Sequence, residues 1–118
     1  MPRLQRRNFS NPEHVRNFPC GSLKTISLDE VVVGNFLLEP GWRWSKDVKP
    51  IAGTPFCQNR HVGWVISGRL HVELPDGTTM EVGPGDAYEF PPGHDAWVLG
   101  DEPFVGMEFK SAAEYAES

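Results

Sequence analysis

Two short stretches decide the fold of this chain: HVGWVISG at residues 61–68 and GDAYEFPPGH at residues 85–94. In the first, six residues separate His61 from Gly68, and an alternating apolar stretch follows this glycine directly. In the second, Gly85 is followed by five residues and then by the turn PPGH. Glycine and proline mark turns because their backbone angles differ from those of other residues. Short strands between such turns are typical of an all-β protein.

The rest of the chain predicts further short strands. Two runs rich in β-branched residues are separated by the polar pair Asp29-Glu30. The tetrad PDGT at residues 75–78 predicts a hairpin turn between two alternating stretches. The predicted strands are residues 23–28, 31–38, 61–67, 69–74, 87–90, 97–99 and 104–109, with a further one around Met80 and Val82. This close, regular spacing indicates a sandwich or barrel.

Helical structure is predicted only in short segments near the ends. Ser10 is followed by a proline and by Glu13, a pattern that favours one helical turn before Pro19. Ser111 and Glu114 form a capping box for a short C-terminal helix. Residues 45–59 are interrupted by two prolines and a glycine, so we expect a loop there.

Length, charge and cysteine content limit the possible classes of protein. The chain has 118 residues, which is the size of one domain. Its net charge of −5 disfavours a nucleic-acid partner, because such affinity depends on cationic contacts to phosphate. No apolar run approaches the roughly 18 residues of a membrane span, and no secretory signal is evident, so we expect no membrane partner. Two cysteines are too few for a disulfide scaffold, and we expect a cytoplasmic protein.

The two stretches quoted above resemble the two motifs of the cupin superfamily, which are small β-barrels that usually hold a metal. The resemblance covers roughly residues 34 to 109 and implies a double-stranded β-helix, or jelly-roll, barrel with short terminal helical turns. The chain then divides into an N-terminal segment with the first strands (1–33), the core barrel (34–109) and a short C-terminal helix (110–118). These parts belong to a single domain.

The strand at residues 61–66 has two apolar faces. His61, Gly63 and Val65 share one face, and Val62, Trp64 and Ile66 share the other. A strand of this kind is expected to be buried on both sides. In so small a barrel, the outer side needs a cover, which is either the N-terminal segment around Phe9 and Phe18 or a second subunit. Small cupins commonly pair through such a sheet, so the resemblance favours a homodimer.

The metal-ligand positions of the cupin pattern are occupied by other residues in this chain. The glutamate position is His61, the two preceding histidine positions are Cys57 and Pro55, and the last histidine position is Ala96. Cys57 and His61 are four residues apart, so both side chains fall on one face of an extended chain. His94 lies two residues before the usual histidine. We therefore predict Cys57, His61 and His94 as candidate ligands.

A set of two imidazoles and one thiolate suits a divalent transition metal, which could be zinc, iron, nickel or manganese. No organic cofactor is predicted. The alternative interpretation is structural: Cys57 is a small buried residue, and His94 fixes its loop through Asp95 or the backbone. A ligand pocket is predicted from Trp42, Trp44, His61, Val65 and His94, because indole offers a broad apolar face with one donor.

Three functions remain open on the sequence. The first is a barrel that binds a small organic ligand, with or without a metal in its mouth, and whose reaction is unassigned. The second is a metal-dependent enzyme of the oxygenase or isomerase type, both of which occur among cupins. The third is a structural or dimerisation domain without a ligand. No catalytic residue is assigned, because fold alone does not identify a reaction.

Overall fold

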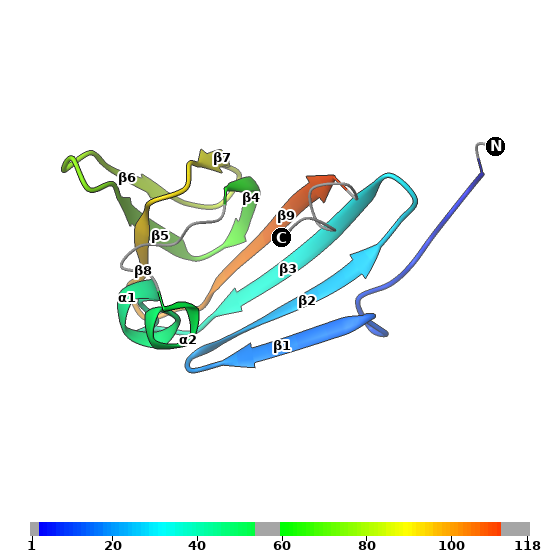
Figure 1. Ribbon diagram of the computed structural model, residues 1–118, viewed down its shortest axis with the longest axis horizontal. Coiled ribbons are helices and arrows are strands. Elements are labelled where there is room, and N and C mark those ends of the chain that lie inside the picture. The colour runs from blue at the N-terminus through cyan, green and yellow to red at the C-terminus, as the bar shows by residue number, and fades with distance from the viewer. Residues whose placement is uncertain (1–2, 54–59, 112–118) are drawn as a thin grey trace.

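The structure is a computed structural model that describes residues 3–53 and 60–111. Nine strands and two one-turn helices occur in these residues (Figure 1). In chain order they are β1 (His14–Phe18), β2 (Gly21–Ser27), β3 (Val31–Leu38), α1 (Trp44–Asp47), α2 (Lys49–Ala52), β4 (His61–Ser67), β5 (Arg69–Glu73), β6 (Thr79–Val82), β7 (Ala87–Phe90), β8 (Asp95–Leu99) and β9 (Phe104–Ser111). No helix in this described part is long and apolar enough to cross a membrane.

The strands form two antiparallel sheets. The larger has six strands in the order β1-β2-β3-β9-β4-β7, and the smaller has three in the order β6-β5-β8. Figure 1 shows the small sheet facing β4 and β7 at one end of the molecule, while β3, β2 and β1 extend away from it. Neighbouring strands such as β4 and β9 come from distant parts of the chain, as in a jelly roll. The predicted all-β jelly-roll class is therefore confirmed.

Alternating side chains of both sheets form one core inside the barrel. On β4, Gly63 and Val65 are buried while Trp64 and Ile66 are exposed, so one face of this strand points inward. The buried core comprises Leu38, Trp42, Trp44, Val65, Leu70, Val72, Val82, Tyr88, Phe90, Ala96, Val98 and Phe104. The barrel interior is thus largely apolar and rich in aromatic rings.

The structure corrects the helical predictions. The N-terminal helical turn was wrong, because residues 14–18 form β1 and pair with β2. Glu13 does not complete a capping box; its carboxylate accepts a hydrogen bond from the Ser27 backbone N–H at 3.2 Å. Sheet pairing therefore overrides the local helical pattern. Lys110 and Ser111 belong to β9, and the rest of the predicted C-terminal helix lies outside the described residues.

The predicted loop at residues 45–59 begins with two short helices instead. The Asp47 carboxylate accepts a hydrogen bond from the Arg43 backbone N–H at 3.0 Å, which closes the first turn around α1. Pro50 occupies the first turn of α2, where a proline is tolerated, and Gly53 ends this helix in the left-handed conformation. These single turns are too short to show an apolar periodicity, so no helical signal is visible in the sequence. Residues 54–59 lie outside the described residues.

Candidate functional site

A row of four residues crosses the inner face of the large sheet. Glu108 on β9 pairs with Gly34 on β3 and with Gly63 on β4, and Gly63 pairs with Tyr88 on β7. Directly opposite residues on neighbouring strands point to the same face. Because no side chain stands between Glu108 and Tyr88, the two side chains can meet across Gly63. The glycine is required there, because a Cβ atom would collide with the backbone oxygen of Met107.

Glu108 is the centre of a hydrogen-bonded cluster on the inner face of the large sheet, and the partly solvent-exposed region around it is here called the mouth. His61 Nδ1 lies 2.6 Å from Glu108 Oε1, and the Tyr88 hydroxyl donates to Glu108 Oε2 at 2.7 Å. Both carboxylate oxygens therefore have a partner on the protein. The side chains of His61 and Glu108 are 19% and 16% exposed, so solvent still reaches the cluster.

The Tyr88 hydroxyl stays protonated in this cluster. Burial raises the pKa of Tyr88 well above its ordinary value, and the nearby Glu108 carboxylate and their hydrogen bond raise it further. All three effects oppose the phenolate form. Tyr88 therefore acts as a hydrogen-bond donor throughout the neutral pH range.

The two histidines of the mouth lie next to each other. The rings of His61 and His94 are 5.1 Å apart between centroids, and Phe36 and Phe90 flank His61 at 6.0 and 6.5 Å. His94 is almost fully buried, and its Nδ1 lies 2.6 Å from the Pro91 carbonyl oxygen. A carbonyl oxygen only accepts hydrogen bonds, so His94 Nδ1 carries the proton and Nε2 the lone pair.

The same reasoning applies to His61. A carboxylate accepts from Nδ1–H, which leaves the lone pair of His61 on Nε2. An imidazole held by a carboxylate in this way is fixed in its ring orientation and tautomer. It can accept a proton from a bound molecule or donate its Nε2 lone pair to a metal ion. The cluster therefore combines a base, a donor and a carboxylate beside two phenylalanine rings.

Not every residue predicted for the site lies in the mouth. His61 and His94 are brought together, whereas Val65 is 1% exposed in the core and Cys57 lies outside the described residues. Trp42 and Trp44 are both buried in the barrel core. The predicted metal site is thus described only in part.

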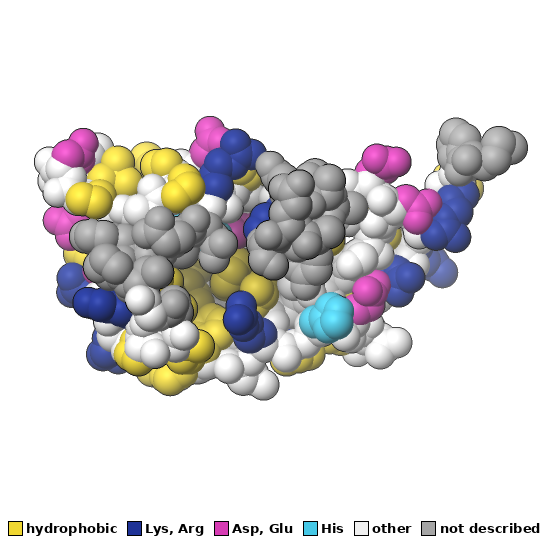
Figure 2. All heavy atoms as spheres, in the orientation of Figure 1, with side chains coloured by type: hydrophobic (Ala, Val, Ile, Leu, Met, Phe, Trp, Pro, Cys, Tyr) yellow, Lys and Arg dark blue, Asp and Glu magenta, His cyan; other side chains and the backbone are white. Residues whose placement is uncertain are grey.

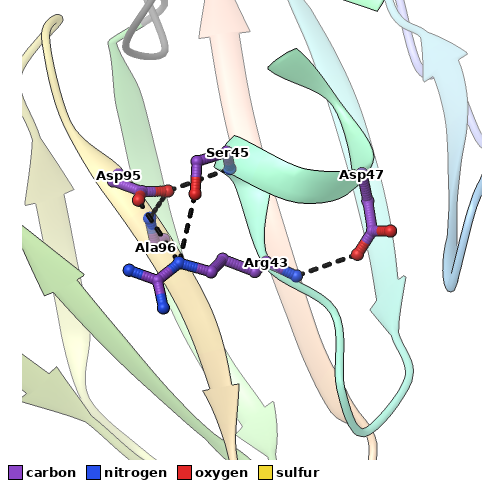
Figure 3. A network of polar contacts seen from close by, with 5 residues as sticks. All are labelled: Arg43, Ser45, Asp47, Asp95 and Ala96. Carbon is purple, nitrogen blue, oxygen red and sulfur yellow. Dashed lines mark hydrogen bonds and ion pairs between the residues drawn. The ribbon is translucent and has the colours of Figure 1, made fainter. Parts of the chain in front are cut away.

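Asp95 does not orient His94. Its carboxylate accepts hydrogen bonds from the backbone N–H groups of Ser45 and Ala96 at 3.1 and 2.9 Å, and it lies 3.6 Å from Arg43 Nε. Figure 3 shows Asp95 directed toward Arg43 and the start of α1. Asp95 therefore holds α1 against β8, and His94 is fixed by its own loop backbone instead.

The described residues supply two nitrogen donors of the predicted metal site. In residues 3–53 and 60–111, no three His, Cys, Asp or Glu side chains are arranged to hold a metal ion. Both oxygens of Glu108 already accept hydrogen bonds, which makes this carboxylate a support for His61 and not a direct ligand. The third side chain of the predicted set, Cys57, lies outside the described residues.

Sequence reasoning missed the central residue, Glu108. The stretch FVGMEF at residues 104–109 predicts only a strand, and Tyr88 lies in the predicted strand 87–90 without a signal that marks it as a site residue. One signal was present: Phe104, Gly106 and Glu108 alternate along one face, so a buried phenylalanine at one end places the glutamate on the inner face too. A carboxylate at an inward position of a strand is rare enough to mark a candidate site.

Comparisons with known proteins agree with this architecture. No protein-family model matches the sequence, and no curated protein is significantly similar to it. Among solved structures, the polyketide cyclase RemF from Streptomyces resistomycificus has a TM-score of 0.63 at 21% identity, over 92% of this chain and 80% of its own. A cupin domain from Bordetella pertussis has a TM-score of 0.53 at 21% identity, over 81% of this chain and 97% of its own.

A variant of the oxalate decarboxylase of Bacillus subtilis also matches, with a TM-score of 0.63 at 20% identity. The match covers 93% of this chain but only 30% of that enzyme. At such identities the likeness concerns the fold alone. The chain has the cupin fold, as the resemblance in its sequence predicted.

Proposed function

We propose that this chain binds a small organic molecule in the mouth of its barrel, against His61, Tyr88, His94 and Glu108. The observation that carries the proposal is the position of the Glu108 carboxylate on the inner face of the sheet, between a histidine and a tyrosine. The Glu108 side chain is 16% exposed, so this carboxylate is partly open to solvent. A bound molecule can therefore reach it.

The energetics favour a binding site over a purely structural barrel. Burying a carboxylate costs free energy that its partners only partly return, and apolar side chains of similar size often stabilise a fold equally well. A barrel without a ligand has no need for this arrangement. An apolar cavity with a few convergent polar groups is the usual form of a small-molecule site. Figure 2 shows hydrophobic side chains gathered near the middle of the face turned to the viewer.

The similar structures support an organic ligand. Two of them are named as a polyketide cyclase and an oxalate decarboxylase, and both names specify an organic substrate. Their low identity to this chain transfers neither substrate nor reaction. The two names support only the proposal that the ligand of this barrel belongs to the class of small organic molecules.

A fragment screen by ligand-observed NMR tests the proposal. The screen compares the wild-type protein with His61→Ala and with the control His14→Ala, which removes an exposed histidine on β1. We expect fragments that bind the wild type and the control but not His61→Ala. Identical binding to all three proteins would place the ligand elsewhere and reject the proposal.

A second candidate function is metal binding by His61 and His94, completed by Cys57. It is favoured by the state of the two imidazoles, because in each the Nδ1 atom is engaged and Nε2 carries the lone pair. Zinc, iron, nickel or manganese would supply a Lewis acid and an open position for a ligand. Elemental analysis of protein purified without chelators tests this candidate. We expect about one metal atom per wild-type chain and none in His94→Ala; a metal-free wild type after incubation with these ions contradicts it.

We also propose that two copies pair through the outer face of the large sheet. Trp64 and Ile66 on β4 are 39% and 50% exposed, and Phe109 on β9, 41% exposed, stacks on Trp64 with a centroid distance of 5.2 Å. The N-terminal segment leaves these side chains uncovered in the described chain. Apolar surface gathered in this way is typical of an interface.

The charges around this outer patch suit a second copy of the same chain. Lys24 borders the patch on the β2 side, and Glu89 borders it on the β7 side. A two-fold axis parallel to the strands places the β2 side of one copy over the β7 side of the other. Lys24 of each copy then faces Glu89 of the other copy, in the manner of an isologous interface. The Glu89 carboxylate also lies 3.4 Å from the Arg60 guanidinium of its own chain.

A further inference from the structure

One buried donor in the barrel lacks a partner. The Nε1–H group of Trp42 is inaccessible to solvent and makes no hydrogen bond, and Trp42 as a whole is 6% exposed. Among the described residues, every other buried side-chain nitrogen or oxygen has a partner. The indole N–H of a buried tryptophan usually finds an acceptor. This exception needs an explanation of its own.

The backbone directs Trp42 into the barrel. Arg43 forms a bridge with Trp97, and its guanidinium lies 4.1 Å from the centre of the Trp97 ring. The Trp42 carbonyl accepts a hydrogen bond from the Val98 N–H at 3.0 Å, which adds this segment to the edge of β8. Neighbouring residues in an extended segment point to opposite faces. Arg43 therefore faces outward, and Trp42 projects into the core beside Trp44.

Water alone is a poor partner for this donor. A buried water molecule normally makes two to four hydrogen bonds. The hydrophobic core cluster that includes Trp42 contains one hydroxyl, that of Tyr88, which is already bonded to Glu108. A molecule that brings an oxygen acceptor on an apolar body satisfies this donor with one hydrogen bond and leaves no further polar group without a partner.

We propose that the Trp42 indole N–H is the anchoring donor for an oxygen acceptor of the molecule bound in the barrel. The ligand is then a mainly apolar, ring-containing compound with a carbonyl or carboxylate oxygen. This inference rests on the proposed binding function and narrows the class of ligand. The aromatic side chains Trp44, Phe90 and Phe104 of the core complement a flat ring.

Two probes of similar shape separate the acceptor from the apolar body. Acetophenone carries a carbonyl oxygen, and isopropylbenzene replaces it with a methyl group. The chain has four tryptophans, so a ¹⁵N-labelled sample gives four indole N–H signals, and the variant Trp42→Phe assigns one of them. The wild-type spectrum by itself reports on the contact, so the test does not depend on the stability of the variant.

We expect acetophenone to move the Trp42 indole signal downfield and to bind at least ten times more tightly than isopropylbenzene. In Trp42→Phe this preference should vanish, while in the control Trp44→Phe it should persist. The free Trp42→Phe protein should melt no lower than Trp44→Phe, because it loses a donor that had no partner.

Three results would overturn the inference. The first is equal affinity for both probes, and the second is a preference that persists in Trp42→Phe. The third is a nuclear Overhauser contact between the Trp42 N–H and a bound water that remains at saturating acetophenone. In each case, fragments that bind the wild type but not His61→Ala would still support a ligand in the mouth. Loss of that His61 dependence is instead the failure of the proposed function.

Discussion

The two faces of strands β4 and β9 differ in how their side chains are satisfied. On the inner face, Glu108 meets His61 and Tyr88, and each polar atom of this contact has a partner. On the outer face, Trp64 and Phe109 stack on each other and remain substantially exposed. The polar groups of the inner face are satisfied within the chain, whereas the apolar side chains of the outer face are not covered by any other described part of the chain. Strand alternation thus gives one pair of strands both a candidate ligand site and a candidate interface.

The largest loss of folding free energy is expected at Gly63, whose backbone belongs to both faces of β4. Gly63→Ala places a Cβ atom against the backbone oxygen of Met107, which cannot rotate away. We expect this variant to lose about 3 kcal/mol of folding free energy or more, because overpacking forces the backbone of β4 and β9 apart. Urea unfolding followed by fluorescence measures the loss. Gly83→Ala is the control, since neither glycine has a positive φ and a Cβ at Gly83 meets only the Arg69 Cγ atom at 3.6 Å, an ordinary contact. Equal stability of Gly63→Ala and wild type would contradict the packing described.

The next effect concerns the outer face. Trp64→Glu places a charge in the centre of the exposed apolar patch, and we expect the dimer to dissociate at least 30-fold more readily, equivalent to about 2 kcal/mol for a central aromatic residue. Sedimentation equilibrium measures the change in mass. Ile51→Glu is the matched control, because Ile51 is 64% exposed on α2, away from the patch. A wild-type protein that is monomeric, or a Trp64→Glu variant that keeps its dimeric mass, would reject the interface.

The inner face is tested through alkaline pH. The pKa of Tyr88 is raised in the folded protein. In the unfolded chain, Tyr88 has the ordinary tyrosine pKa of about 10. Above that pH the unfolded chain loses the hydroxyl proton, while the folded protein still holds it. The stabilisation is fully present below about pH 10 and falls as pH rises above it, by about 1.4 kcal/mol per pH unit. Denaturation curves of wild type and Tyr88→Phe isolate this contribution when they are measured from about pH 8 to about pH 11, a range that brackets the ordinary tyrosine pKa of about 10. Parallel pH profiles for the two proteins would show that Tyr88 is not held as described.

The smallest effect is expected at the border of the outer patch. Leu37 on β3 is 37% exposed and lies at the side of the patch, where partly solvated residues contribute little to binding. Leu37→Ala should weaken the dimer by about 0.5 kcal/mol or less. Sedimentation equilibrium under the same conditions as for Trp64→Glu compares the two positions. A loss as large as that of Trp64→Glu would move the centre of the interface toward β3.

Much of the fold could be predicted because its signals are local. The turn glycines Gly68, Gly77 and Gly85 all have positive φ, a conformation that few other residues adopt. The bounds predicted for residues 31–38 and 61–67 coincide with β3 and β4. The N-terminal turn failed for the opposite reason: the pattern at Ser10 was local, while the pairing of β1 with β2 depends on distant residues.

The candidate site could be predicted only in part. His61 and His94 were found because each lies within a motif that resembles the cupin pattern, and the structure places their rings together. Glu108 and Tyr88 belong to no motif. Their contact depends on the register between β4, β7 and β9, and on the missing side chain of Gly63. Sequence spacing contains no information about such a register between strands distant in the chain.

The most direct test of a ligand in the mouth is a fragment screen of the wild type against Glu108→Gln. Glutamine keeps the size of the side chain but removes the charge that holds His61 and Tyr88. The control Glu81→Gln makes the same change at an exposed position on β6. We expect fragments that bind the wild type and Glu81→Gln but lose at least tenfold in affinity for a folded Glu108→Gln protein. Equal binding to all three proteins would contradict this expectation.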